Sequence, residues 1–315
     1  MILVPRKCIR MALLAATTLT VAAAGCGGDA ASGGPPAADA EEPLAIVATT
    51  MQLQDFARQV GGGNVRVSGV LAPDNEPHEY EPTPSDAEAL AAADVVIENG
   101  ANLDDWLDDL LSNAGGDARR VTAVEGIELL PTEEEGFPGD PHVWHDPEAA
   151  KRMVDNIAAG LSAADPANRD AYARNATAYK QQLDDMATEI RETFAPIPPQ
   201  ERKLITTHDA FGYFVRAYDL QQVGTVLPTV TTRSEPSGRQ VRELVGEIRE
   251  ENVGTIFTEE AVDASLERQI AQEAGAEVST SLYADVLGGP GSGAETFIAA
   301  ELANARAMVR AWQGS

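Results

Sequence analysis

The residues of this chain best suited to chemistry are its four histidines and one late aspartate. His78 lies a few residues past an apolar segment typical of a strand, His208 immediately follows another, and Asp285 lies just past a third, before a glycine turn. In open α/β sheets, ligands gather at the carboxyl ends of the strands. Imidazole and carboxylate groups bind Zn²⁺ and neighbouring divalent ions well. His78, His142, His208 and Asp285 are therefore candidate metal ligands, two from each half of the chain.

The histidine pattern alone does not decide between a metal site and a set of packed or exposed side chains. A lone histidine is more often structural than a ligand. The four histidines of this chain, however, all lie at turns, mostly beside aspartate or proline. The sequence contains no HExxH motif and no cysteine pair with zinc-finger spacing, so the common local signatures of a zinc hydrolase or zinc finger are missing.

The net negative charge of the chain argues against nucleic acids as partners. The 315 residues include 23 Lys and Arg against 50 Asp and Glu, a net charge of −27. Such a surface repels the phosphates of nucleic acids and the headgroups of anionic lipids. It attracts cations, although an acidic surface commonly serves only solubility. We therefore expect no nucleic-acid partner.

The N-terminus indicates export. Residues 1–26 have a basic head, an apolar run and small residues before Cys26, which predicts a signal peptide with a lipobox-like end. Lipidation of Cys26 would anchor the chain at the outer side of the cell membrane, and ordinary cleavage is the alternative. Residues 27–43 are rich in Gly, Ala, Pro and acids, which predicts a flexible tether. Membrane contact is expected only through the lipid anchor.

Short apolar segments alternate with helical ones on both sides of a long helical region. This alternation predicts an α/β fold with parallel sheets and flanking helices. We expect an N-terminal lobe at 44–146 and a C-terminal lobe at 197–315. Between them, residues 147–196 are helical, and residues 167–194 form one helix with a narrow apolar stripe. Such a helix suits a rigid backbone joining two lobes; a surface helix of a single domain is the alternative.

Five segments together resemble the cluster 9 (A-I) family of metal-binding lipoproteins that serve zinc and manganese ABC importers. They are PHEYEPTPSD (77–86), ADVVIENG (93–100), DPHVWHDP (140–147), THDAFGYF (207–214) and LYADVLG (282–288). The resemblance covers nearly the whole chain after the tether. It implies two α/β lobes joined by one backbone helix, with the ion buried between them. By motif, the family's ligands correspond to His78, His142, His208 and Asp285, the residues already selected from their positions.

Several residues around these motifs have open roles. His145 stands where the family often has Leu; it is an alternative ligand or a residue that supports a ligand, but we expect it to point to solvent. Glu259 is expected to accept a hydrogen bond from a ligand histidine, and Asp209 to support His208 or cap a helix. The loop at residues 131–140 is acidic and lacks histidine, so its three glutamates are expected to be solvated rather than to gather metal.

Three imidazoles and one carboxylate suit four-coordinate Zn²⁺, whereas Mn²⁺ prefers more oxygen ligands. The resemblance to this family implies that the chain is an extracytoplasmic receptor, which captures a divalent ion and delivers it to a membrane permease. A manganese receptor is the alternative. A zinc hydrolase or a surface adhesin is less favoured, because four protein ligands leave no open position for an activated water. We expect a monomer whose affinity for metal falls below about pH 6, where imidazoles become protonated.

Overall fold

A computed structural model describes residues 42–73, 75–279 and 281–314. The predicted signal peptide, Cys26 and all but the last two residues of the predicted tether lie outside the described residues. Among those that are described, no helix has the length and apolar character needed to cross a membrane.

A four-stranded parallel sheet forms the first half of the fold. Its strands, β1 (Leu44–Ala48), β2 (Val65–Gly69), β3 (Val95–Glu98) and β4 (Arg119–Thr122), have the order β2-β1-β3-β4. Neighbouring residues of β1 face opposite sides. Ile46 packs in the core beneath α1 (Met51–Gly61) and α4 (Pro147–Ala164), whereas Val47 packs with Leu90 of α2 (Pro84–Ala91) and Leu107 of α3 (Trp106–Ala114). Burial on both faces explains why the two central strands, β1 and β3, are almost entirely apolar, whereas the edge strands β2 and β4 carry arginines. The arrangement confirms the predicted parallel sheet flanked by helices. The elements of this half are β1 (Leu44–Ala48), α1 (Met51–Gly61), β2 (Val65–Gly69), α2 (Pro84–Ala91), β3 (Val95–Glu98), α3 (Trp106–Ala114) and β4 (Arg119–Thr122).

One predicted helix start is wrong by two residues. The sequence indicates Ser85 as the N-cap of the second helix with Glu88 three residues on, but Thr83 caps α2 and Pro84 is its first residue. The carboxylate of Asp86 accepts hydrogen bonds at 2.7 Å from both the backbone N–H and the hydroxyl of Thr83. Proline at the first helical position favours this earlier start because it needs no hydrogen-bond acceptor there.

The second half carries two parallel strand pairs, β5-β6 and β7-β8. The backbone N–H of Phe257 donates to the carbonyl of Ile205 at 2.8 Å, which brings the two pairs together. The sequence predicts strands at residues 255–258 and 277–282, but β7 and β8 have only two residues each. The elements here are β5 (Lys203–Thr206), α6 (Gly212–Tyr218), β6 (Gln221–Thr225), α7 (Gly238–Glu250), β7 (Thr255–Ile256), α8 (Ser265–Ala274) and β8 (Glu277–Val278).

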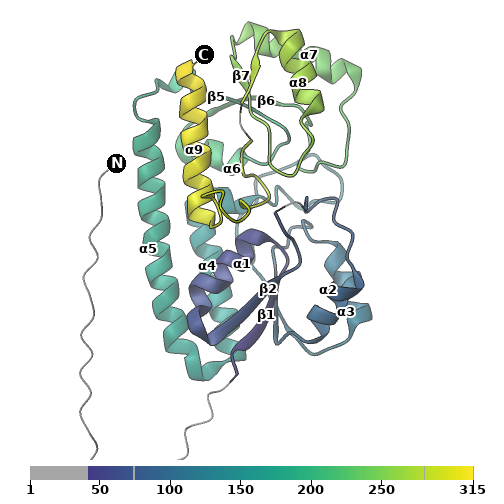
Figure 1. Cartoon of the computed structure of the whole chain (residues 1–315), viewed down its shortest axis with the longest axis vertical. Coiled ribbons are helices and arrows are strands. Elements are labelled where there is room, and N and C mark those ends of the chain that lie inside the picture. The colour runs from purple at the N-terminus through teal and green to yellow at the C-terminus, as the bar shows by residue number, and fades with distance from the viewer. Residues whose placement is uncertain (1–41, 74, 280, 315) are drawn as a thin grey trace, which may run out of the picture. The chain divides into compact units, whose positions relative to one another are not determined.

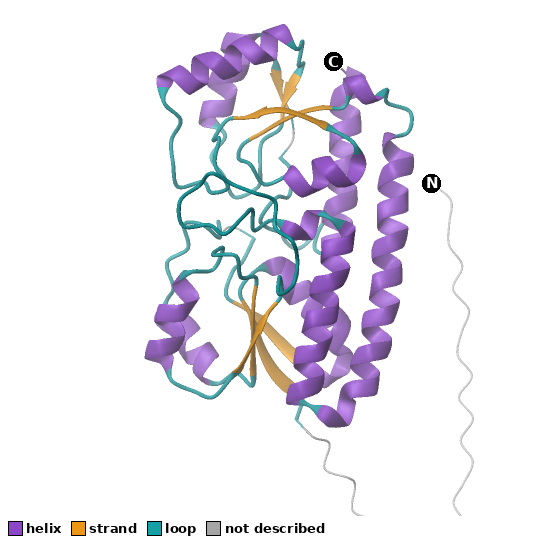
Figure 2. Ribbon diagram, turned by 180° about the vertical axis from the view of Figure 1, so that it is seen from behind, coloured by secondary structure: helices purple, strands orange, loops and turns teal. Residues whose placement is uncertain are grey.

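Long helices run beside both strand regions (Figures 1 and 2). Helix α5 (Arg169–Phe194) contacts α1, α4 and α9 (Phe297–Gly314), and it extends for about 39 Å at 1.5 Å per residue. Its buried face is the predicted stripe from Tyr172 to Phe194, with Ala187 in addition. The remaining segments are η2 (Val143–His145), α4 (Pro147–Ala164), α5 (Arg169–Phe194), α9 (Phe297–Gly314) and the short turns η1 (Gly62–Asn64), η3 (Pro166–Asn168) and η4 (Pro199–Glu201).

The largest apolar core is shared by the two halves. It includes Ile46 of the first sheet, Leu183 of α5, Met308 of α9, and also Leu204 and Phe257 from the second half. The loops at the carboxyl ends of the strands therefore lie on one continuous apolar core, which we call the packed base.

The stripe of α5 gives a direct test of this base. Leu183→Ala should lower the free energy of unfolding by about 2–5 kcal/mol, because a fully buried side chain is replaced by a cavity. Gln182→Ala, on the exposed side of the same helix, is the matched control and should change it by less than about 0.5 kcal/mol. Urea unfolding measures both, and equal effects would contradict the packing of α5.

Candidate metal centre

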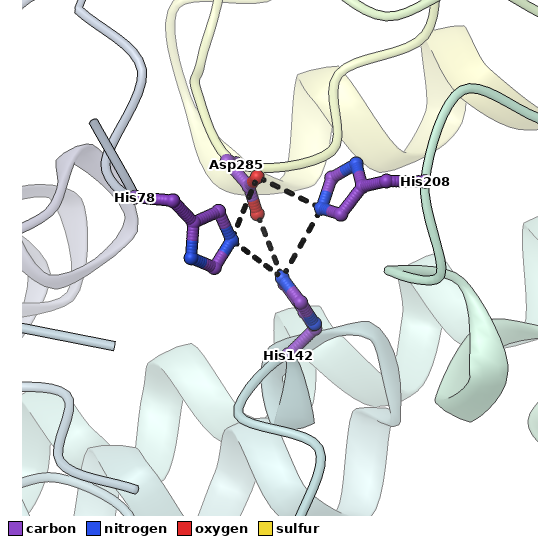
Figure 3. A group of neighbouring side chains, drawn as sticks. All are labelled: His78, His142, His208 and Asp285. Carbon is purple, nitrogen blue, oxygen red and sulfur yellow. Dashed lines mark hydrogen bonds and ion pairs between the residues drawn. The ribbon is translucent and has the colours of Figure 1, made fainter. Parts of the chain in front are cut away.

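Four buried side chains from distant parts of the chain point toward one another (Figure 3). They are His78, His142, His208 and Asp285, and each offers a ligand atom within 4.8 Å of the others. His78 lies in the loop after β2, His142 immediately precedes η2, His208 follows β5, and Asp285 lies beyond β8. The structure therefore brings together the four residues that the sequence selects.

The spacing of the donor atoms suits one small ion. Nε2 of His142 lies 3.3 Å from Nε2 of His78 and 3.4 Å from Nε2 of His208. The carboxylate of Asp285 lies 3.2 Å from His142 and His208 and 3.5 Å from His78. Ligands of a tetrahedral Zn²⁺ with bonds of 2.0–2.1 Å are about 3.3 Å apart. These five separations, those to Asp285 taken to its nearer oxygen, lie close to this value, and the four ligand atoms all lie within 4.8 Å of one another.

Two further buried carboxylates orient the imidazoles. Asp140 Oδ1 lies 2.7 Å from Nδ1 of His142, and Glu259 Oε2 lies 2.5 Å from Nδ1 of His208. A carboxylate on Nδ1 fixes the proton there and leaves Nε2 to face the centre. Glu259 is the carboxylate that the sequence selects for this role. Sequence reasoning missed Asp140, although its position two residues before His142 was a usable signal.

The segment that carries Asp285 is held from two sides. Asn304 of α9 hydrogen-bonds both the N–H and the carbonyl of Tyr283, each at 2.8 Å. The carbonyl of Ala284 accepts from the indole of Trp144 at 3.2 Å and from the side chain of Gln52 at 3.3 Å. Because Trp144 lies two residues after His142, this contact also fixes the spacing between His142 and Asp285.

The electrostatics of the centre favour positive charge. Burial alone would lower the pKa of His142, but Asp285 and Asp140 outweigh it and raise the pKa to about 9. In His208 burial is likewise outweighed, by Glu259 and Asp285, so its pKa lies well above the ordinary value. Burial would raise the pKa of Asp285, yet His142 and His208 hold it well below its usual range. A cation entering this centre must displace protons, and this competition begins far above the pH 6 expected from the sequence.

The sequence expectation for His145 is wrong, and so is one of the two roles expected of Asp209, that of a helix cap. His145 does not point to solvent: it is buried, its Nδ1 lies 2.9 Å from Glu301 of α9, and its ring stacks on Phe211. It lies outside the group of four converging side chains. Asp209 caps no helix, because α6 begins at Gly212 with Phe211 as its N-cap. Its carboxylate instead accepts a hydrogen bond from Gln222 at 2.9 Å.

The acidic loop also differs from expectation at one residue. Glu133 and Glu135 are exposed, as a solvated charge run should be. Glu134 instead accepts hydrogen bonds from the backbone N–H of Val230 at 2.8 Å and from the hydroxyl of Thr231 at 2.7 Å. This carboxylate therefore links the two halves of the chain.

Comparison with known proteins gives consistent matches over most of the chain. The family described as ZnuA, zinc-uptake complex component A, periplasmic, matches residues 46–311. The chain is 34% identical to the manganese-binding lipoprotein MntA of Bacillus subtilis strain 168 over 266 residues, covering 82% of this chain and 86% of that protein. It is 30% identical to the iron-binding protein YfeA of Yersinia pestis over 263 residues, 83% and 84% of the two chains.

Solved structures show the same fold. The periplasmic zinc-binding protein TroA from Treponema pallidum has a TM-score of 0.79 at 27% identity, covering 86% of this chain and 99% of that one. A crystal structure of ZnuA has a TM-score of 0.77 at 28% identity, covering 86% and 100%.

The raised pKa of His142 predicts how stability depends on pH. In the unfolded chain this imidazole has an ordinary pKa of about 6.5, whereas in the fold it is about 9. Folding therefore favours the protonated form, and this stabilisation is fully present below about pH 6.5 and disappears as the pH rises through about 9. Urea unfolding of the metal-free protein should show stability falling over this range, and Asp140→Asn should reduce the slope. A stability that stays constant or increases would contradict the prediction.

Proposed function

The chain belongs to the ZnuA family of metal-binding, substrate-binding components of ABC importers, and from this premise we propose that it captures Zn²⁺ outside the cytoplasm and delivers it to a membrane permease. The observation that carries the proposal is the convergence of four buried donors whose ligand atoms lie within 4.8 Å of one another. His78, His142, His208 and Asp285 are the proposed ligands.

The donor chemistry supports zinc as the cargo. Three imidazole nitrogens and a carboxylate form a set typical of four-coordinate Zn²⁺, and Mn²⁺ prefers more oxygen donors. Manganese is the second candidate, because one oxygen of Asp285 faces His142 while the other faces His78 and His208. A carboxylate that binds through both oxygens would give a five-coordinate site.

A receptor role fits the site better than hydrolysis. A catalytic zinc has three protein ligands and keeps a fourth position for water. Here four residues that could each donate a ligand atom converge within 4.8 Å of one another, and all four are buried. The two carboxylates behind His142 and His208 are occupied in orienting imidazoles, so neither is placed as a general base for an attacking water.

The export signal completes the proposal. Lipidation at Cys26 would keep a monomeric receptor at the membrane surface, on a tether that reaches residue 43. Lobes at 44–146 and 197–315 would each supply two ligands, so that binding joins the two halves. The long helix α5 supports a modest closure, because it packs on elements of both halves.

Ligand substitution tests the site. We expect one Zn²⁺ per chain by calorimetric titration at neutral pH. Alanine at His78, His142, His208 or Asp285 should weaken binding by more than the roughly 10–100-fold that loss of a supporting residue costs. Asp209→Asn is the matched control, because this carboxylate adjoins His208 in sequence but contacts Gln222. Unchanged binding in any alanine variant would remove that residue from the ligand set.

Coordination geometry separates zinc from manganese as the intended ion. Zn²⁺ binds most nitrogen and oxygen sites more tightly than Mn²⁺, so relative affinity alone is not decisive. Substitution with Co²⁺ should give the intense visible absorption of a tetrahedral site, whereas a weak octahedral spectrum would favour manganese. Metal analysis of the protein purified from its own host should then find zinc.

A further inference from the structure

One short segment of the second half contacts all three histidine-bearing regions of the centre. It comprises residues 229–233, between β6 and α7, and we call it the strap. Val230 and Thr231 are buried, at 2% and 1% exposure, although no helix or strand includes them. A buried loop must find partners for its backbone groups, and those partners show what the strap holds.

The first contact leads to His208. The backbone N–H of Asp209 donates to the carbonyl of Thr229 at 3.0 Å. Since Asp209 directly follows His208, the strap is bonded to the chain at the residue next to this proposed ligand. The hydroxyl of Thr229 donates to the carbonyl of Thr231 at 2.7 Å, which stiffens the strap between its anchors.

The second contact leads to His142. Glu134 accepts from both Val230 and Thr231, so one carboxylate holds two consecutive strap residues. The loop that carries Glu134 ends at Asp140, the carboxylate that orients His142. Tyr213 fixes this loop further, because its hydroxyl donates to the carbonyl of Asp140 at 2.9 Å.

The third contact leads to His78. The guanidinium Nε of Arg233 donates to the backbone carbonyl of His78, and a terminal nitrogen of the same group lies 3.6 Å from Asp105. Among the described residues, no carboxylate bonds Nδ1 of His78, in contrast to His142 and His208. The position of His78 therefore depends more on its backbone, which Arg233 holds from the opposite half.

We propose that the strap closes the metal centre, and that Glu134 and Arg233 are positioning residues that hold the three histidines at binding distance and slow release of the ion. This inference rests on the proposed function. For an ion to leave, the loops of His78 and His208 must separate, and the strap is bonded to both. Loss of either anchor should therefore speed dissociation.

An effect of long-range charge alone predicts other release rates than the strap does, so the two explanations can be separated by experiment. Removing the cation of Arg233 should slow release of a bound cation if only Coulomb attraction matters, and removing the anion of Glu134 should speed it. The strap predicts faster release in both cases. Arg233→Ala and Glu134→Gln should each accelerate dissociation of Zn²⁺ roughly tenfold, the usual cost of a hydrogen bond to a charged group.

Stopped-flow transfer of Zn²⁺ from the purified protein to a chromophoric chelator measures this rate. Glu133→Gln is the control for Glu134, since it removes the same charge one residue away, and Arg239→Ala removes an exposed arginine of α7. Both should release Zn²⁺ at the wild-type rate. Arg233→Lys keeps the charge without the planar fork and should fall between the wild type and Arg233→Ala.

The outcomes are distinct. Faster release in Arg233→Ala and Glu134→Gln, with unchanged controls and an unchanged melting temperature of the metal-free protein, supports the strap. Rates that shift in opposite directions, or that stay at the wild-type value, overturn it. If Glu134→Gln does not fold, Arg233→Lys and Arg233→Ala decide. Failure of the wild type to bind Zn²⁺ or Mn²⁺ would instead overturn the proposed function.

Discussion

The structure depends on the charge balance of one buried cluster. Three imidazoles meet three carboxylates there, Asp140, Glu259 and Asp285, all shielded from solvent. Buried carboxylates are costly unless a positive charge compensates them. Protons on His142 and His208 supply that charge in the metal-free protein, which is why both pKa values rise. A divalent ion can replace those protons without leaving a buried charge uncompensated, so the centre exchanges one form of positive charge for another.

The scaffold meets this demand by holding the four ligands through three kinds of contact. The segment of Asp285 is fixed by side chains of rigid helices, Asn304 of α9 and Gln52 of α1. His142 and His208 are fixed by hydrogen bonds to their rings. His78 lies in a loop, and its carbonyl is held by Arg233 from the other half of the chain. In the centre, the carboxylate of Asp285 is held by helices, whereas the loops of the three histidines are all connected through the strap.

Sequence reasoning succeeded where the physical signal is local or periodic. The stripe of α5 could be predicted because apolar spacing defines a helix face, and the positions of His78 and His208 because ligands gather after parallel strands. The burial of His145 could not be predicted, because its partner Glu301 lies 156 residues further along the chain. Glu134 looked like part of a solvated charge run for the same reason, since its acceptor role depends on a loop 96 residues away. The roles of Thr83 and Asp140 could have been predicted, because each contacts a residue no more than three positions away in the sequence.

The shared core constrains how such a centre can open. Leu204 and Phe257 of the second half belong to the same apolar cluster as Ile46 of the first sheet and Leu183 of α5. A large rotation of one half against the other would expose part of that cluster, at about 25 cal/mol for each Å² of apolar surface returned to water. Moving the loop of His78 or the strap breaks a few hydrogen bonds, each contributing about 1 kcal/mol on balance, and exposes a small apolar area that includes the side chain of Val230. Opening through these loops is therefore the less costly route, and it leaves the packed base of helices and sheets intact.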